Sequence, residues 1–182
     1  FKVPKEIERF KNHPQSRRII LRAKVAIIHN KHTLYPHLRP DEIEPLENFK
    51  EPRIIEVPER LTVRSGDEKV TVEMANKKYP PGKLILRTSS EAMTRGTALG
   101  ELNRVDILGE IGVIGSYSLY EMGVTGFPSA GFIYGEFGPA QDGDTSILED
   151  EDNDCVSNDR ARLVVNDMSK ALLEWIADEV DK

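Results

Sequence analysis

The sequence predicts a mostly β protein with a short helix near its start and a longer helix at its end. Apolar runs of strand length recur along the chain, and turn residues separate them. Residues 109–139 are dense in glycine, which marks bends and bulges between short strands. Only residues 158–182 carry a long apolar repeat at helical spacing. Many short strands with regular turns are typical of a β-sandwich or a barrel.

The N-terminal part of the chain predicts one helix and one strand. Residues 1–14 are expected to contain a short amphipathic helix, because Ile7 and Phe10 share one side and charged residues surround them. Pro14 ends this helix. Residues 17–30 form the first strong strand candidate, with apolar residues at alternate positions.

The next segment predicts an irregular insertion over residues 38–52, which are acidic and interrupted by prolines. Three histidines, His29, His32 and His37, lie close to its start. Histidines so spaced can bind a metal, but no flanking cysteine or glutamate completes a recognisable ligand set. We therefore favour a polar surface loop over a metal site and assign no metal ligands.

Four short strands are predicted in the middle of the chain. Their ranges are 53–57, 60–64, 69–74 and 83–88. Pro58 separates the first two strands, and Ser65-Gly66-Asp67 supplies the turn chemistry of a hairpin between the second and the third.

The C-terminal part predicts an acidic loop followed by a helix. Residues 141–157 are rich in Asp and Glu with no compensating base, which is typical of a solvated loop and less so of a metal site. Residues 158–182 are expected to hold the helix, with Asn166 or Ser157 as its N-terminal cap. Its apolar stripe is formed by Met168, Leu172, Leu173, Trp175, Ile176 and Val180.

Composition limits the classes of function. A chain of 182 residues is long enough for one domain with its own core, so we expect residues 1–182 to form a single domain. The net charge of −6 disfavours a general nucleic-acid binder. Cys155 is the only cysteine, which excludes an intrachain disulfide. The absence of a membrane-length apolar run and of a signal-like start predicts a cytoplasmic protein.

Three segments resemble the dCTP deaminase and trimeric dUTPase superfamily. Residues 115–124 read Gly-Ser-Tyr-Ser-Leu-Tyr-Glu-Met-Gly-Val, similar to the family's Gly-Arg-Ser-Ser-Leu-Ala-Arg-Leu-Gly-Val. Residues 130–137 read Ala-Gly-Phe-Ile-Tyr-Gly-Glu-Phe and resemble its Ala-Gly-Phe-Ile-Asp-Pro-Gly-Phe. Residues 79–91 are similar to the family strand that precedes both motifs. The resemblance implies a distorted jelly roll, a homotrimer and a pyrimidine deoxynucleotide ligand, with Mg²⁺ if that ligand is a triphosphate.

The resemblance also implies the residues of a nucleotide site, and several differ from the family pattern. Ser116 stands where the family has its phosphate-binding arginine, Tyr117 where it has a serine, and Tyr134 where it has the catalytic or sugar-binding aspartate. Ile20 likewise replaces an aspartate. Replacement cations are Arg87, Arg95 or Arg104. The nucleotide-binding candidates are therefore Gly115, Ser116, Ser118, Gly131, Tyr134, Phe137 and Arg104.

Three functions follow as hypotheses. The first is a nucleotide-binding, regulatory or structural relative that has lost the standard catalytic residues, a pseudoenzyme. The second is an active deaminase or diphosphohydrolase with relocated residues, in which Glu149 is the catalytic proton shuttle. The third is an assembly protein unrelated to nucleotides, with the acidic loop and the C-terminal helix as contact surfaces. The glycines, Ser118, Tyr134 and Phe137 also allow a purely structural interpretation, as turn and core residues.

Overall fold

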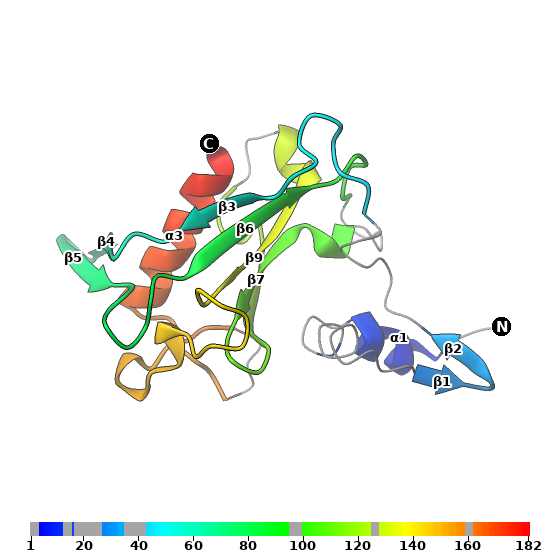
Figure 1. Ribbon diagram of the computed structural model, residues 1–182, viewed down its shortest axis with the longest axis horizontal. Coiled ribbons are helices and arrows are strands. Elements are labelled where there is room, and N and C mark those ends of the chain that lie inside the picture. Colours follow the sequence, from blue (N-terminus) through cyan, green and yellow to red (C-terminus); the bar gives the residue numbers. More distant parts are fainter. Residues whose placement is uncertain are drawn as a thin grey trace.

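The protein is mostly β, as the sequence predicts. A computed structural model describes residues 4–12, 16, 27–34, 43–94, 100–124, 128–158 and 162–182. These residues contain nine strands in three sheets and two α-helices (Figure 1). The strands are β1 Ile27–His29, β2 His32–Leu34, β3 Arg53–Glu56, β4 Arg60–Ser65, β5 Glu68–Glu73, β6 Lys83–Thr88, β7 Arg104–Leu108, β8 Val113–Ser118 and β9 Ile133–Gly138. The helices are α1 Lys5–Asn12 and α3 Asp167–Asp181, with 3-10 turns η2 Gly100–Leu102, η3 Pro128–Phe132, η4 Ile147–Glu149 and η5 Glu151–Asn153.

A five-stranded sheet forms the centre of the molecule, with strand order β3-β6-β9-β7-β8. All neighbours are antiparallel except β9 and β7, which run parallel. The last strand of the described residues, β9, therefore lies in the middle of the sheet, and its pairing joins the β3–β6 half to the β7–β8 hairpin. This sheet has free edges at β3 and β8, so the described strands do not close into the barrel that was one of the two expected architectures.

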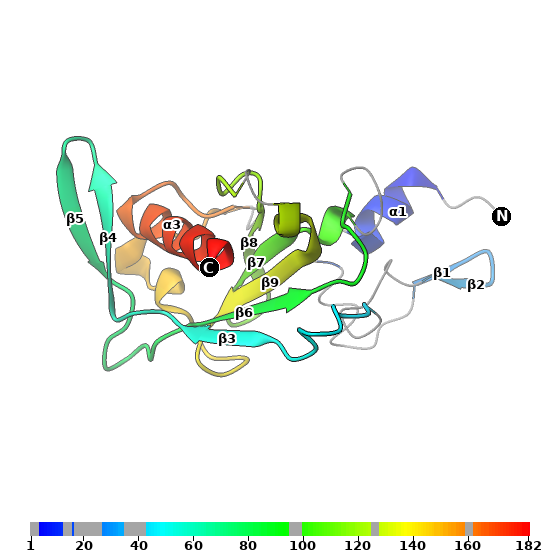
Figure 2. The same cartoon turned by 90° about the horizontal axis from the view of Figure 1, so that it is seen from above.

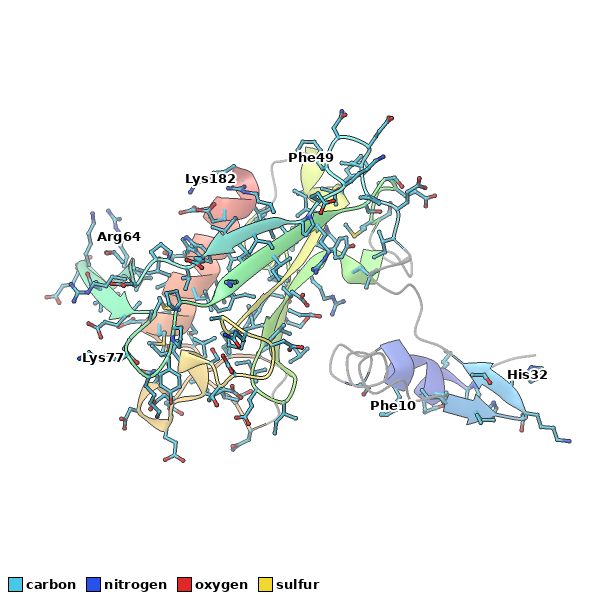
Figure 3. All side chains as sticks on the ribbon, viewed as in Figure 1. Phe10, His32, Phe49, Arg64, Lys77 and Lys182 are labelled. Carbon is cyan, nitrogen blue, oxygen red and sulfur yellow. The ribbon has the colours of Figure 1, made fainter. Side chains whose placement is uncertain are left out.

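The hairpin of β4 and β5 is a separate two-stranded sheet. Its turn is Gly66-Asp67, since Ser65 pairs with Glu68 across the end of the hairpin. Gly66 has a φ of 65°, a left-handed conformation that glycine adopts without strain. This confirms the hairpin predicted from the turn chemistry. Arg64 at the tip points away from the body (Figure 3).

Helix α3 supplies the core on one face of the large sheet. Asn166 caps its first turn by accepting a hydrogen bond from Ser169 N, so the helix begins at Asp167, well after residue 158. Leu172 and Ile176 are completely buried. Trp175 packs edge-on against Phe137 of β9, with ring centroids 6.2 Å apart. Figure 2 shows α3 lying between the β4–β5 hairpin and the large sheet, and the apolar sides of all three meet in one core cluster.

A second, smaller core lies on the opposite face at one end of the sheet. Tyr134 of β9 is buried there against Ile43, Met93 and Leu102. Residues 43–50 lie against the same end of the sheet. There Leu46 N donates a hydrogen bond to Thr88 Oγ1, at the end of β6. The predicted insertion is thus irregular over residues 43–50, and residues 38–42 lie outside the described residues.

The N-terminal elements α1, β1 and β2 lie to one side of this body in both views (Figures 1 and 2). The helix expected within residues 1–14 is confirmed over Lys5–Asn12. Of the strand expected over residues 17–30, only Ile27–His29 falls on described strand residues, because residues 17–26 lie outside them. Among the helices of the described part of the chain, none has the length and apolar character of a membrane span.

Replacing Ile176 by alanine tests whether α3 holds the fold together. This side chain has no exposed surface, so we expect Ile176→Ala to lower the free energy of unfolding by about 2–5 kcal/mol. Ile111→Ala is the matched control, because Ile111 is 71% exposed and should change stability by no more than about 0.5 kcal/mol. Urea unfolding followed by tryptophan fluorescence measures both. Equal effects of the two changes would contradict the packing described here.

Candidate functional site

Polar side chains gather on the face of the large sheet that α3 does not cover. The pairing register places them in two neighbouring rows across the strands. One row runs Ile85, Glu136, Asp106, Ser116. The other row runs Arg87, Tyr134, Arg104, Ser118. Val105 pairs with Gly135 in the parallel ladder of β7 and β9, so Arg104 lies beside Tyr134. We call the charged and hydroxyl-bearing members the charged face: Arg87, Arg104, Asp106, Ser116, Ser118, Tyr134 and Glu136.

Two carboxylates and two arginines dominate the charged face. Arg87 forms an ion pair of 3.4 Å with Glu136. The Ser116 hydroxyl donates to Asp106 Oδ1 at 2.6 Å and accepts from an Arg104 Nη at 3.4 Å. The Arg104 Nε is buried and has no acceptor among the described residues. Because a buried polar group normally has a hydrogen-bond partner, this N–H has capacity for an acceptor that the described part of the chain does not supply.

Ser118 keeps a hydroxyl of the family motif. Together with Tyr117, Glu121, Arg162 and Leu163 it forms a cluster of polar contacts at the end of β8, which we call the clasp. The backbone N–H and the hydroxyl of Ser118 both donate to Glu121 Oε2 at 2.9 Å. Arg162 pairs with the other oxygen of Glu121 and lies over the Tyr117 ring at 5.2 Å. The Leu163 N–H donates to the Tyr117 hydroxyl at 2.8 Å. The clasp therefore ties the segment before α3 to the edge strand β8.

The clasp shifts the pKa values of two of its members. Burial raises the pKa of Glu121, but the hydrogen bonds from Ser118 and the charge of Arg162 together outweigh it, so the pKa lies below its ordinary value of 4.5. Burial raises the pKa of the Tyr117 phenol above 10.0, against the smaller effects of the Leu163 N–H and Arg162. At neutral pH the clasp therefore holds a carboxylate and a protonated phenol.

The predicted nucleotide-binding residues do not all meet. Arg104, Ser116 and Ser118 lie together on the charged face. Phe137 is 1% exposed and lies on the face covered by α3, in contact with Trp175. Gly115 faces the same side, because a Cβ there would lie 3.1 Å from the Tyr117 ring and 3.3 Å from Leu163. The sheet itself separates these two groups of residues.

The other predicted residues are not open to a ligand in this arrangement. Tyr134 is 8% exposed and belongs to the second core, which covers the middle of the charged face between Arg87 and Arg104. Gly131 lies in η3, where its carbonyl accepts from Met93 N at 2.7 Å. The hollow beside Phe137, lined also by Pro80, Pro139 and Thr145, has a volume of about 10 Å³. That is room for about one water and not for a sugar ring.

Glu149, the predicted proton shuttle, lies at the other end of β8. Its Oε2 accepts hydrogen bonds from Glu110 N at 2.8 Å and Ser146 N at 3.1 Å. Gly109 leaves the space for this carboxylate, since a Cβ there would lie 2.4 Å from Glu149 Oε1. The strand of residues 113–118 separates this turn from Ser118 by about 17 Å. The structure thus joins Glu149 to the β7–β8 turn and does not bring it to the serines.

No group of three or more His, Cys, Asp and Glu side chains in the described residues is arranged to hold a metal. His29 and His32 face each other across β1 and β2. Ile20, His37 and Arg95 lie outside the described residues.

Four charged residues of the site were not predicted: Asp106, Glu121, Glu136 and Arg162. One signal was available for Asp106, because Arg104-Val105-Asp106 alternates charge about an apolar residue, which places both charges on one side of a strand. Glu136 and Arg162 carry no comparable local signal, since their partners lie 49 and 41 positions away.

Comparison with family models, with characterised proteins and with solved structures gives no match for the chain. The resemblance to the dCTP deaminase and dUTPase superfamily stays a prediction.

Removing the Glu149 carboxylate tests its place in the structure. Glu149→Ala leaves the N–H groups of Ser146 and Glu110 without their acceptor, so we expect a loss of about 1–3 kcal/mol in the free energy of unfolding. Glu151→Ala is the matched control on the neighbouring exposed turn and should cost less than about 0.5 kcal/mol. Chemical unfolding measures both. A neutral Glu149→Ala change would refute the role assigned to this carboxylate.

The clasp predicts a pH dependence of stability. Because the folded pKa of Glu121 lies below 4.5, its contribution is present above pH 4.5 and is lost as the pH falls through the folded pKa. Glu121→Gln should therefore be less stable than the wild type at pH 7, and the difference should shrink below about pH 4. Thermal unfolding of both proteins between about pH 3 and pH 7 measures it. A difference that does not change with pH would exclude an ionic contribution.

Proposed function

We propose that the chain is a binding protein without the catalysis of the family it resembles, and that its ligand site is the charged face. The ligand we propose is small and carries a phosphate, of the pyrimidine deoxynucleotide class that the resemblance implies. The same resemblance implies a jelly-roll topology, a homotrimer and an Mg²⁺ ion bound with a triphosphate. These three features are part of the proposal only as implications of that resemblance.

The observation that carries the proposal is that Arg104 Nε finds no acceptor among the described residues and shares its face with a second arginine. Arg87 and Arg104 lie on the two strands that flank β9, so two strand spacings put their Cα atoms about 10 Å apart. Both side chains rise from one face of the sheet on either side of the covered Tyr134, and the proposed anion binds between the ends of the two guanidinium groups. Hydrogen bonds from a guanidinium to phosphate are charge-assisted and match its planar fork. A phosphate there would supply the acceptor that Arg104 Nε lacks among the described residues.

The same geometry argues against standard catalysis. The two hydroxyls are engaged with carboxylates, Ser116 with Asp106 and Ser118 with Glu121. Tyr134 is buried, and a phenol with an ordinary pKa near 10 is a poor general base at neutral pH. Asp106 and Glu136 lie one row away from the arginines and offset part of their charge, so we expect modest affinity for an anion.

An active enzyme with relocated residues is the alternative that this proposal must exclude. That mechanism needs Glu149 to transfer a proton to the pyrimidine base of the bound nucleotide. Glu149 instead accepts backbone hydrogen bonds from Glu110 and Ser146 at the β7–β8 turn, away from the charged face. Incubation of the protein with dCTP and with dUTP, with and without Mg²⁺, tests it by product analysis. Turnover at ordinary enzymic rates that Glu149→Gln abolishes would overturn the proposal in favour of this alternative.

Removing the Arg104 guanidinium tests the ligand site. We expect Arg104→Ala to weaken binding of dCTP or dUTP by roughly 10- to 100-fold, because charge-assisted hydrogen bonds contribute about 1.5–3 kcal/mol. Arg60→Ala is the matched control, since Arg60 is exposed on the β4–β5 hairpin and pairs only with Glu73 in the described residues. Titration calorimetry measures the dissociation constants, with inorganic phosphate as a second probe.

Two outcomes would refute the ligand site. The first is no binding of either nucleotide by the wild type at millimolar concentration. The second is equal binding by the wild type and Arg104→Ala, which would place any nucleotide elsewhere. Loss of binding in Arg104→Ala with an unchanged melting temperature supports the proposal.

A further inference from the structure

Strand β5 forms an outer edge of the molecule. In both views it lies beyond β4, on the side away from the large sheet (Figures 1 and 2). It pairs with β4 alone among the described strands. The ladder runs from the pair Arg60–Glu73 to the pair Ser65–Glu68 without a bulge, and β5 contains no proline. A regular, exposed edge of this kind can pair with a further strand.

The register shows which backbone groups of β5 point to its free edge. Met74 N donates to Glu59 O at 2.7 Å, so these two residues are a hydrogen-bonded pair. Such pairs alternate with non-hydrogen-bonded pairs along an antiparallel ladder. Lys69, Thr71 and Glu73 therefore belong to the non-hydrogen-bonded pairs with β4. Their N–H and C=O groups point away from β4, and no other described strand pairs with them.

The sequence of β5 is complementary to itself when it is reversed. It reads Glu-Lys-Val-Thr-Val-Glu over residues 68–73. A two-fold axis at Thr71, perpendicular to the hairpin, places Thr71 opposite Thr71 of a second copy and Lys69 opposite its Glu73. In this antiparallel register all three outward residues exchange backbone hydrogen bonds, about six in total. Moving the axis to Val70 or Val72 leaves about four and takes Lys69 away from an acidic partner.

Lys69 forms no ion pair within the described residues. It lies directly opposite Arg64, and both residues are exposed. Like charges that face each other across a ladder are destabilising. The Glu73 side chain is 62% exposed, its Oε1 accepts from Arg60 at 3.4 Å, and no described residue donates to its Oε2. Glu73 of a second copy can therefore pair with Lys69 and keep its own contact with Arg60.

The inner side of β5 carries apolar surface that its own chain covers only in part. Leu61 and Val63 of β4 are buried, whereas Val70 and Val72 of β5 are half-buried. In the proposed register Val70 and Val72 of the second copy form a non-hydrogen-bonded pair, in which side chains lie closest. Helix α3 packs more on β4 than on β5. The two β4 strands would lie three strand spacings apart, about 14 Å, which is wider than the separation of packed helices.

We propose that a second copy of this chain pairs with β5 edge to edge, in a symmetric dimer. The two hairpins then form one antiparallel sheet with the strand order β4-β5-β5-β4. The contact is isologous and closed, because both copies use the same edge. It is limited to one strand about 20 Å long, which buries less than the roughly 800 Å² per partner of a standard interface. The dimer is therefore weak and concentration-dependent.

Two comparisons within the chain favour this edge and this occupant. β3, a free edge of the large sheet, lies between Pro52 and Pro58, and prolines beside an edge strand hinder further pairing. β5 has no such protection, and its charges match its own sequence in reverse. The hairpin is separated from the large sheet by α3 (Figure 2), so the dimer leaves the charged face free for the proposed ligand.

Charge reversal on β5 tests the dimer without any nucleotide. Sedimentation velocity of the wild type from about 10 to about 500 µM protein, the range in which a weak interface assembles, should give a monomer–dimer equilibrium. Lys69→Glu opposes two carboxylates across the axis, and Glu73→Lys opposes two ammonium groups. Each single variant should therefore dimerise at least roughly tenfold more weakly. Arg64→Glu makes the same change of charge on β4, away from the contact, and is the matched control that should dimerise like the wild type.

The two-fold symmetry makes a sharper demand on the same variants. A mixture of Lys69→Glu and Glu73→Lys pairs opposite charges at both ends of the contact and should form a heterodimer, although neither variant forms its own dimer well. The double variant Lys69→Glu/Glu73→Lys should likewise regain self-association. Melting temperatures of all variants show that each is folded. A general loss of structure cannot produce this rescue.

A proline at the axis tests the backbone pairing. Thr71→Pro removes an N–H that points to the free edge and takes no part in the ladder with β4. It should weaken the dimer at least roughly tenfold, because one donor is lost from each copy at the centre of the contact. Thr71→Ala keeps the N–H and is the matched control, which should dimerise more strongly than Thr71→Pro.

Three results would overturn the dimer. They are a wild type that is monomeric throughout the range, a mixture of the two charge variants that stays monomeric, and an assembly, a trimer included, that neither charge variant weakens. None of these results bears on the ligand, because sedimentation is run without nucleotide. Loss of nucleotide binding in Arg104→Ala likewise leaves the dimer untouched.

Discussion

The packing of α3 on one face of the five-stranded sheet is the constraint on which the rest of the structure depends. Leu172 and Ile176 are fully buried, and Trp175 meets Phe137 of the central strand. A single helix covers only one face of a sheet. The pleat then sends every second side chain to the other face, where the smaller core around Tyr134 covers a part and no α-helix of the described residues packs. Arg87, Arg104, Asp106 and Glu136 are therefore gathered by the same alternation that fills the core.

Much of the fold could be predicted from local patterns in the chain. The hairpin of β4 and β5 follows from the Ser65-Gly66-Asp67 turn, and α3 follows from an apolar repeat at helical spacing with Asn166 as its cap. These signals are local, because the residues that make them lie within a few positions of each other. The order of the strands is not local. β9 pairs antiparallel with β6, about 50 positions earlier, and parallel with β7. No turn sequence between these strands predicts either pairing.

The site was harder to predict for the same reason. Ser116, Ser118 and Arg104 were named from motif positions and do share a face, because all three lie in one hairpin. Phe137 was placed with them by its motif position. The odd-numbered residues of β9, Phe137 among them, face α3, whereas Glu136 lies on the face that carries the arginines. A difference of one position in a strand thus decides between core and site. Motif spacing does not contain that information until the strand's register is known.

The buried cysteine gives the junction between the acidic segment and α3 a built-in reporter. Cys155 has no exposed surface, and its sulfur lies between the Asn153 carbonyl at 3.3 Å and the side-chain amide of Asn166 at 3.3 Å. Asn166 also caps α3, so the thiol is reached only when the start of that helix separates from the segment beneath it. Since the chain has one cysteine, labelling by a thiol reagent reports on that single junction, and the labelling rate equals its opening rate when labelling is faster than reclosing.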